Sequence, residues 1–318
     1  MKRKISTGLF LVTLIALLIT ACAPAPAALP GEVSATQPAG TAITVKNADG
    51  SDFRLEEPAQ HVISLAPSNT EILFALGASS QLIGREEFSN FPPEAAEIPS
   101  VGGSMGKYNL EEIARLQPDL VLASPLTPSE ALQSLREVTP NVYVVPNPTE
   151  LEGLFQNLLS VGALTGRQIE AELLVAGLRT RAEAVQEKVS SAAEKPKVFY
   201  ELDATDPSKP WTAGQGSFIN LLIELAGGQN IAAGLPEYTQ LSQEELIVQN
   251  PDVILLGDAL YGGITAESVA ARPGWESIAA VQNGRVLPFN DDLVSRPGPR
   301  MVDGLEELAK ILHPGLDW

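Results

Sequence analysis

The sequence is short of the residues on which most catalytic and metal sites depend. Its 318 residues include one cysteine, Cys22, and two histidines, His61 and His313. A single cysteine excludes a disulfide within the chain, and two histidines leave little from which to build a Ser-His-Asp triad or a multi-histidine metal site. The phosphate-binding patterns GxxxxGKS/T and GxGxxG do not occur. We therefore predict that the protein is not an enzyme and has no catalytic residue, metal site or cofactor of its own.

Positive charge is also scarce. The chain has 21 Lys and Arg residues against 39 Asp and Glu residues, which gives a formal net charge of −18. Binding to a phosphate backbone requires a basic surface, and no basic cluster follows the first few residues. Nucleic acid is therefore excluded as a partner.

No hydrophobic run is long enough to cross a membrane. The longest, Leu9 to Ala21, has thirteen residues and follows the basic residues 2–4, whereas a spanning helix needs about 20. This pattern predicts a signal peptide over residues 1–21. Cys22 comes next, in "LITAC", which resembles a bacterial lipobox whose cysteine receives diacylglycerol; the alternative is a stray cysteine near a cleavage site. Residues 22–40, rich in Pro, Ala and Gly, are predicted to form a flexible tether.

The rest of the chain alternates between helix and strand patterns. After a predicted β-hairpin at 42–55, a short apolar strand at 61–67 leads into a helix that a residue of 68–70 is expected to cap. Further on, an amphipathic helix precedes a second apolar strand at 120–123. This alternation is typical of parallel α/β sheets. A long helical pattern over residues 166–193 then separates an N-terminal lobe, 41–165, from a C-terminal lobe, 194–318. We predict an α/β protein with two lobes of mainly parallel sheet joined by this single helix.

The two lobes contain an internal repeat. Residues 110–122 ("LEEIARLQPDLVL") align without a gap with residues 243–255 ("QEELIVQNPDVIL"), at an offset of 133 residues. Both copies have two adjacent glutamates near the start and a Pro-Asp turn before the strand. Chance similarity between two generic helix-turn-strand units is the alternative, but the repeat favours two lobes of the same fold.

Large apolar side chains stand in expected loops rather than at the periodic core positions. Aromatic residues make up only 5% of the chain, so their concentration in these loops is informative. Each could simply anchor its own loop. As a group they predict an apolar-walled ligand site, because ligands bind at the carboxyl ends of strands in open α/β sheets. The candidate ligand-binding residues of this kind are Phe88, Met105, Tyr108, Trp211 and Tyr238.

These stretches together resemble the substrate-binding proteins of ABC importers for cobalamin, haem and iron-siderophores. The similar segments run in order from "HVISLAPSNTEILFALGASSQLIG" through "NLEEIARLQPDLVLAS" and "WTAGQGSFINLLIELAGGQNIA" to "RPGWESIAAVQNGRVLPF". The resemblance implies a ligand cleft between the lobes. It also implies an extracytoplasmic receptor, lipid-anchored to the cell membrane, that delivers its ligand to an ABC permease dimer with ATPase subunits.

The resemblance further implies that each lobe presents a surface glutamate to arginines of the permease. The matching positions are Glu71 and Glu224. The alternative for Glu71 is a helix-dipole contact in a first helical turn, worth about 0.3–1 kcal/mol. That alternative does not explain Glu224, which lies near the end of its helix.

The ligand is less well defined. Aromatic walls suit cobalamin or haem, whereas an anionic ferric siderophore requires several cations, and we prefer cobalamin by a small margin. The cationic candidates are Arg85, Lys107, Lys209, Arg296 and Arg300, of which Arg296 is included in the predicted ligand site. Two other functions stay open: a cell-surface α/β enzyme acting on a chelate or ester through Asp203 and Asp206, and a scaffold lipoprotein without transport.

Overall fold

The computed structural model describes residues 42–318, with the side chain of Met105 excepted. The predicted signal peptide, tether and Cys22 lie outside this range. The described chain begins with the predicted hairpin, in which β1 (Ile43–Lys46) pairs antiparallel with β2 (Asp52–Leu55).

The N-terminal lobe, residues 42–165, is built on a four-stranded sheet in the order β4-β3-β5-β6. Every pair in this sheet is parallel. Its strands are β3 (Val62–Ser64), β4 (Leu82–Arg85), β5 (Leu120–Ala123) and β6 (Val142–Val144). Its helices are α1 (Pro67–Ala75), α2 (Leu110–Leu116), α3 (Ser129–Val138) and α4 (Leu151–Leu164), with 3-10 turns η1 (Ser79–Gln81), η2 (Pro93–Glu97) and η3 (Ser104–Gly106).

The start of α1 differs from the prediction. Its N-cap is Ala66, with Pro67 at the first helical position and no side-chain cap, so the expected cap by a residue of 68–70 is wrong. Proline suits this position because its missing N–H would have no helical partner there. As a result Glu71 lies beyond the first turn, and the first turn contains no acidic residue. The helix-dipole explanation for Glu71 therefore fails.

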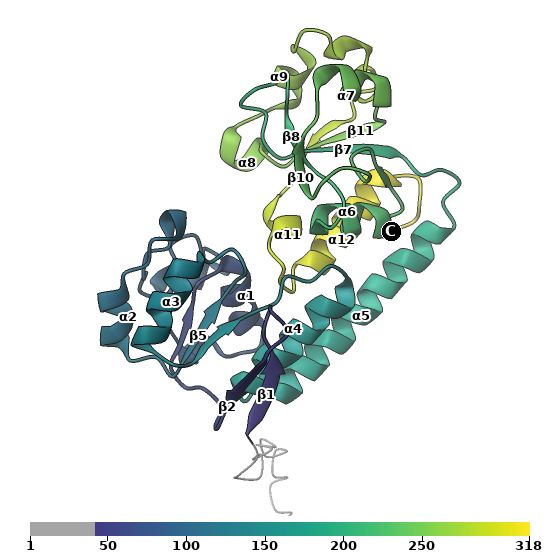
Figure 1. Cartoon of the computed structure of the whole chain (residues 1–318). Helices are drawn as coiled ribbons and strands as arrows, with labels where there is room; N and C mark the ends of the chain where they lie inside the picture. Colours follow the sequence, from purple (N-terminus) through teal and green to yellow (C-terminus); the bar gives the residue numbers. More distant parts are fainter. Residues whose placement is uncertain (1–41) are drawn as a thin grey trace, which may run out of the picture. The chain divides into compact units, whose positions relative to one another are not determined.

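A single long helix, α5 (Gln168–Ser190), connects the lobes, as predicted. Its 23 residues span about 34 Å at 1.5 Å per residue. It packs against α4 and, from the C-terminal lobe, against α12 (Met301–Leu312) (Figure 1). Arg179 of α5 pairs with Glu152 of α4 at 2.7 Å, and Arg181 donates to Asp303 of α12 at 2.6 Å.

The C-terminal lobe, residues 194–318, repeats the sheet of the first. Its order is β12-β11-β7-β9, again with every pair parallel. Read along the chain, β7, β9, β11 and β12 occupy the places of β3, β4, β5 and β6. The strands are β7 (Lys197–Glu201), β9 (Gln229–Asn230), β11 (Val253–Leu256) and β12 (Val286–Pro288), with β8 (Trp211–Ala213) and β10 (Tyr238–Gln240) in a separate ribbon. The helices are α6 (Phe218–Leu225), α7 (Gln243–Gln249), α8 (Ala259–Gly262), α9 (Ala266–Ala270), α10 (Ala279–Gln282), α11 (Asp292–Ser295) and α12, with η4 at Trp275–Ser277.

The internal repeat extends to atomic detail. The α2 N-cap, Asn109, accepts a hydrogen bond from the backbone N–H of Glu112 at 3.1 Å, and the α7 N-cap, Ser242, accepts one from Glu245 at the same distance. Both helices end in a left-handed residue, with φ of 51° in α2 and 49° in α7. This agreement confirms that the two units share one fold.

The aspartates of the two Pro-Asp turns also act alike. Asp119 accepts from the backbone N–H of His61 at 2.9 Å, and Asp252 accepts from that of Lys197 at 2.8 Å. In each lobe the carboxylate therefore ties the start of one strand to its neighbour in the sheet.

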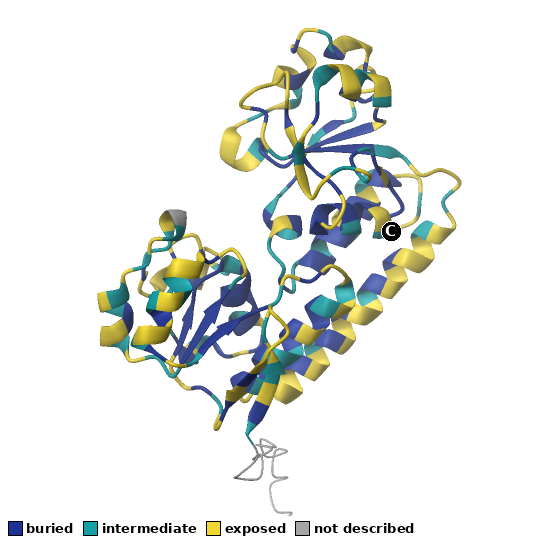
Figure 2. Ribbon diagram, viewed as in Figure 1, coloured by how far each residue is buried: buried dark blue, intermediate teal, exposed yellow. Residues whose placement is uncertain are grey.

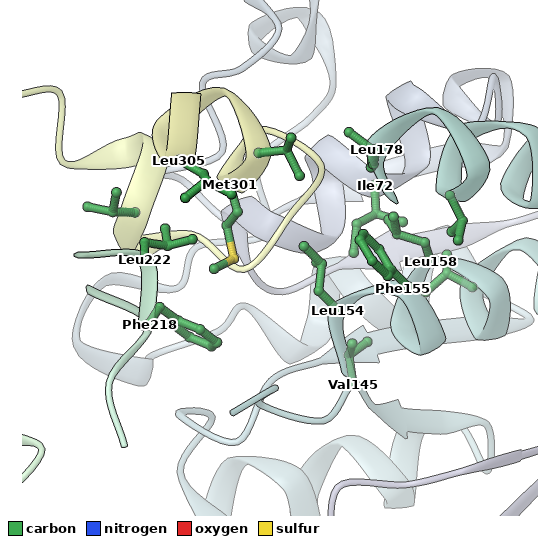
Figure 3. Close-up of a cluster of buried hydrophobic side chains, with 14 of the residues drawn as sticks. Ile72, Val145, Leu154, Phe155, Leu158, Leu178, Phe218, Leu222, Met301 and Leu305 are labelled. Atoms are coloured by element: carbon green, nitrogen blue, oxygen red, sulfur yellow. The ribbon is translucent and has the colours of Figure 1, made fainter. Parts of the chain in front are cut away.

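One buried apolar cluster runs through both lobes and the connecting helix. It includes Ile72 and Leu154 from the N-terminal lobe, Leu178 from α5, and Leu222 and Met301 from the C-terminal lobe (Figure 3). The central strands of both sheets, β3 with β5 and β7 with β11, are almost entirely buried, whereas α5 alternates between buried and exposed faces along its length (Figure 2). The lobes are therefore joined by packed side chains as well as by the chain.

Candidate functional site

The loops that follow the parallel strands expose large apolar side chains. Phe88, 57% exposed, comes after β4, and Leu126, 91% exposed, comes after β5. In the C-terminal lobe, Leu260 and Tyr261 follow β11 and are 59% and 64% exposed. Both lobes thus expose apolar surface at the carboxyl ends of their strands, where ligands bind in sheets of this kind.

Trp211 and Tyr238 lie in a small β-ribbon rather than in the loops that we expected. In the antiparallel pair of β8 and β10, Trp211 is opposite Gln240 and Tyr238 is opposite Ala213. The two aromatic residues are therefore diagonal neighbours on one face of the ribbon, and they are 43% and 52% exposed. The Trp211 N–H donates to the Asp203 carbonyl at 2.8 Å, which fixes the ribbon just beyond the carboxyl end of β7.

Tyr108 is only partly exposed, and its ring packs against a glycine. Gly103 has φ of 124°, and a Cβ there would lie 2.9 Å from the Cβ of Glu86 and 3.3 Å from the Tyr108 ring. Burial raises the pKa of the Tyr108 hydroxyl. Glu86, which is buried, also accepts from the Phe88 N–H at 2.8 Å, so its carboxylate fixes the backbone at Phe88. Met105 lies in η3 beside them, but its side chain is outside the described part of the chain.

Glu71 is not a surface residue, which corrects the prediction that it docks to a permease. Its side chain is 2% exposed and pairs with Arg300 of the C-terminal lobe. Arg300 donates through Nε to Oε2 at 2.8 Å and through Nη2 to Oε1 at 2.6 Å. Arg296 adds a longer contact to Oε1, at 3.4 Å. A carboxylate enclosed in this way cannot reach the arginines of another protein.

Arg296 is likewise not a free cation. Its side chain is 12% exposed and pairs with Asp292 at 2.9 Å. It also donates to Oδ1 of Asn90, in the N-terminal lobe, at 2.8 Å, and Asp292 accepts from the Tyr261 hydroxyl at 3.0 Å. A hydrogen-bonded chain therefore connects the loop that carries Phe88 with the short helix α8, which carries Tyr261.

Of the other candidate cations, Arg85 is also committed to internal contacts. Arg85 donates to backbone carbonyls, including those of Ala95 at 2.8 Å and Glu86 at 3.0 Å. Lys209 is exposed beside Asp206. Hydrogen bonds from Ser208 lower the pKa of Asp206, and the charge of Lys209 lowers it slightly further. Lys107 alone among the five is exposed with neither an ion pair nor an acidic neighbour of this kind among residues 42–318.

The enzyme alternative finds no support in its two aspartates. Asp203 and Asp206 each cap a nearby turn, and hydrogen bonds from Thr205 and Ser208 lower their pKa values, so neither is set up to exchange protons near neutral pH. His313 is buried with Nε2 against the Ala226 carbonyl at 3.0 Å. Within residues 42–318 no group of Cys, His, Asp or Glu could hold a metal ion, and no helix is long and apolar enough to cross a membrane.

Comparison with known proteins agrees with this architecture. The family model described as "Periplasmic binding protein" matches residues 62–293. The chain belongs to this family. The assignment confirms the resemblance to substrate-binding proteins of ABC importers, and it confirms that the protein is a receptor rather than an enzyme.

Three individual proteins illustrate the similarity. An uncharacterized ABC transporter substrate-binding lipoprotein, YvrC of Bacillus subtilis, is 31% identical over 277 residues, 86% of each chain. The periplasmic vitamin B12-binding protein BtuF of Vibrio cholerae superposes with a TM-score of 0.69 at 29% identity, covering 81% of this chain and 98% of that one. The periplasmic heme-binding protein RhuT of Roseiflexus sp. RS-1 gives 0.72 at 26% identity, covering 80% and 98%.

Several exposed apolar residues of the receptor were missed in the sequence. Leu126, Leu260 and Tyr261 each follow a strand that we had predicted, in "ASPLTP" and "LGDALYGG". The signal available in the sequence was their position just after the carboxyl end of a strand.

Asp258 is an unusual carboxylate at this edge of the C-terminal sheet. It is 9% exposed, and its Oδ2 accepts from the Ala204 N–H at 3.2 Å, whereas Oδ1 is buried with no hydrogen-bonding partner among residues 42–318. Burial, and secondarily the charge of Glu201, raises its pKa to about 6. Glu201 itself is paired with Arg272 through two hydrogen bonds, of 2.5 and 2.8 Å.

Replacing Asp258 should therefore change how stability depends on pH. Because the folded state holds this proton more tightly than the unfolded chain, the wild type should gain stability as pH falls from above 6 to about 4. Asp258→Asn should be more stable than wild type at pH 8, and the difference should disappear near pH 4 in urea unfolding. Asp206→Asn is the control with the opposite sign, because its pKa is lowered. A pH-independent effect of Asp258→Asn would contradict the assignment.

Proposed function

We propose that the protein is the extracytoplasmic receptor of an ABC importer for a metal chelate, with cobalamin as the preferred ligand. It captures the chelate without making or breaking a bond and delivers it to a permease dimer driven by ATPase subunits. A lipid on Cys22 would hold it at the cell membrane, with residues 22–40 as the tether.

The observation that carries the proposal is the exposed apolar surface at the same edge of both sheets. Phe88 and Leu126 in one lobe, and Trp211, Tyr238 and Tyr261 in the other, provide flat or bulky surfaces that stay exposed within residues 42–318. Soluble proteins seldom expose so many large apolar side chains around one edge unless they bind something there. The chelate would lie between these two groups, with its ring faces against the aromatic side chains.

The charges of the site favour cobalamin over an anionic chelate. Arg296 and Arg300 are neutralised by Asp292 and Glu71, and Arg85 is held by carbonyls, so few cations are free to bind carboxylates or catecholates. Haem has two propionates, and ferric catecholates are strongly anionic, whereas the corrin of cobalamin carries neutral amides. The similar proteins named for vitamin B12 and heme support this class of ligand, and the charge balance favours cobalamin within it.

The internal repeat offers a pair of docking residues in place of the buried Glu71. Glu111 and Glu244 are separated by the repeat offset, and each is exposed in the first turn of its helix, α2 or α7. Neither forms an ion pair within residues 42–318, whereas the neighbouring Glu112 pairs with Arg115 at 2.5 Å. Glu224 is exposed as well, but it accepts from Asn220 at 3.0 Å and lies outside the internal repeat. We therefore assign docking to Glu111 and Glu244 and keep Glu224 as the comparison.

Ligand binding should depend on Trp211. Trp211→Ala should weaken the binding of cyanocobalamin by about 1–3 kcal/mol, the scale of an aromatic anchor in a binding site, as measured by calorimetry. Trp318→Ala is the matched control, since this tryptophan stacks on Lys188 in the C-terminal segment. Failure of the wild type to bind any chelate would leave the scaffold lipoprotein as the better function.

Anchoring should depend on Cys22. In cells, Cys22→Ser should move the protein from the membrane fraction to the soluble fraction or leave its precursor unprocessed, because the thiol that receives the lipid is gone. Fractionation followed by immunoblotting measures this. Mature protein that remains with the membrane after the change would show that something else holds it there.

Docking should depend on the repeated glutamates. The double variant Glu111→Lys with Glu244→Lys should abolish uptake of labelled cobalamin in cells, because like charges facing the permease can cost several kcal/mol. Its ligand affinity in solution should stay at the wild-type level. Glu224→Lys should transport normally. Normal uptake by the double variant would rule out the assignment, and lost uptake with Glu224→Lys alone would transfer the docking role to α6.

A further inference from the structure

Glu71 and Arg300 form a buried ion pair between the lobes. Glu71 belongs to α1, and Arg300 immediately precedes α12, the helix that packs on α5. The two side chains are 2% and 12% exposed. A Cβ added at Gly298 would lie 3.6 Å from Oε2 of Glu71, so the segment before Arg300 passes directly over the carboxylate. Removing one member of such a pair leaves a buried charge without compensation, which is strongly destabilising.

The same arginines also hold a loop of the proposed ligand site. The Arg300 guanidinium stacks on the Phe91 ring at 3.8 Å, and Arg296 donates to Asn90 at 2.8 Å. Both partners belong to the N-terminal loop that exposes Phe88. The C-terminal lobe thus contacts this loop at two adjacent residues, and Glu71 pairs with both arginines that make these contacts.

We propose that Glu71 and Arg300 form an inter-lobe clamp that fixes the distance between the lobes and so selects ligands by thickness. The distance concerned is that between Phe88 in the N-terminal lobe and Trp211 with Tyr238 in the C-terminal lobe. Glu71 is then a positioning residue that never touches the ligand. Fixing the spacing before the ligand arrives avoids the free energy of ordering the lobes on binding. The effect on the ligand rests on the proposed function, whereas the effect on the lobes does not.

The protein contains a matched pair for comparison. Glu201 and Arg272 also form a two-point buried ion pair, with side chains 0% and 8% exposed, but both belong to the C-terminal lobe. Glu71→Gln and Glu201→Gln therefore remove the same charge from the same kind of contact. Only Glu71→Gln should change the distance between the lobes.

Spacing can be measured directly, because Cys22 is the only cysteine. In protein that carries Cys22→Ser, spin labels can be attached through Gln133→Cys in α3 and Ala270→Cys in α9, which are both exposed positions. Pulsed electron paramagnetic resonance on the ligand-free protein should give a narrow distance distribution. Glu71→Gln should broaden it and Arg300→Lys should broaden it less, since lysine keeps the charge but loses the two-point contact. Glu201→Gln should leave the distribution unchanged while lowering the Tm.

An unchanged distribution for Glu71→Gln, or equal broadening for Glu201→Gln, would overturn the clamp. In parallel, Glu71→Gln should weaken cyanocobalamin binding about tenfold, the loss expected when a preorganised site must be ordered by its ligand. Wild-type protein that binds no chelate would count against the proposed function alone, because the distance measurement needs no ligand.

Discussion

Burial of the Glu71 carboxylate is the constraint on which the arrangement of the two lobes depends. An isolated charge in such a place would be very costly, and breaking a buried pair costs about 3–5 kcal/mol. Both arginines that neutralise Glu71 come from the opposite lobe. The N-terminal lobe is therefore most stable when the C-terminal lobe is packed against it. The apolar cluster that runs through α4, α5 and α12 acts in the same direction.

The two lobes are built from the same local structures. Each places a helix with a polar N-cap and a left-handed end before a Pro-Asp turn, and each uses the aspartate to fix a neighbouring strand. These devices are local, which is why thirteen residues were enough to reveal the repeat. What differs between the lobes is the β8–β10 ribbon, which has no counterpart in the N-terminal sheet and which presents Trp211 and Tyr238.

The sequence predicted well what depends on neighbours along the chain, and poorly what depends on residues far apart. The strands, the linking helix and the equivalence of the lobes all follow from short patterns. Glu71 was misplaced because its partners lie more than 220 residues away, and nothing near it in the chain marks it as buried. Trp211 and Tyr238 were expected in loops because three-residue strands of a ribbon are too short to show alternation. Tyr261 was overlooked although its position after β11 is of the kind that we had singled out elsewhere.

In the proposed function, a flat, largely uncharged chelate lies between the aromatic side chains of two lobes, and the distance between the lobes is set before the chelate binds. The most direct test is a crystal structure of the protein grown with cyanocobalamin. We expect the corrin to lie between Phe88 on one side and Trp211 with Tyr238 on the other, with the contact of Glu71 and Arg300 intact. Density for the ligand elsewhere, or lobes that have rotated with this contact broken, would contradict it.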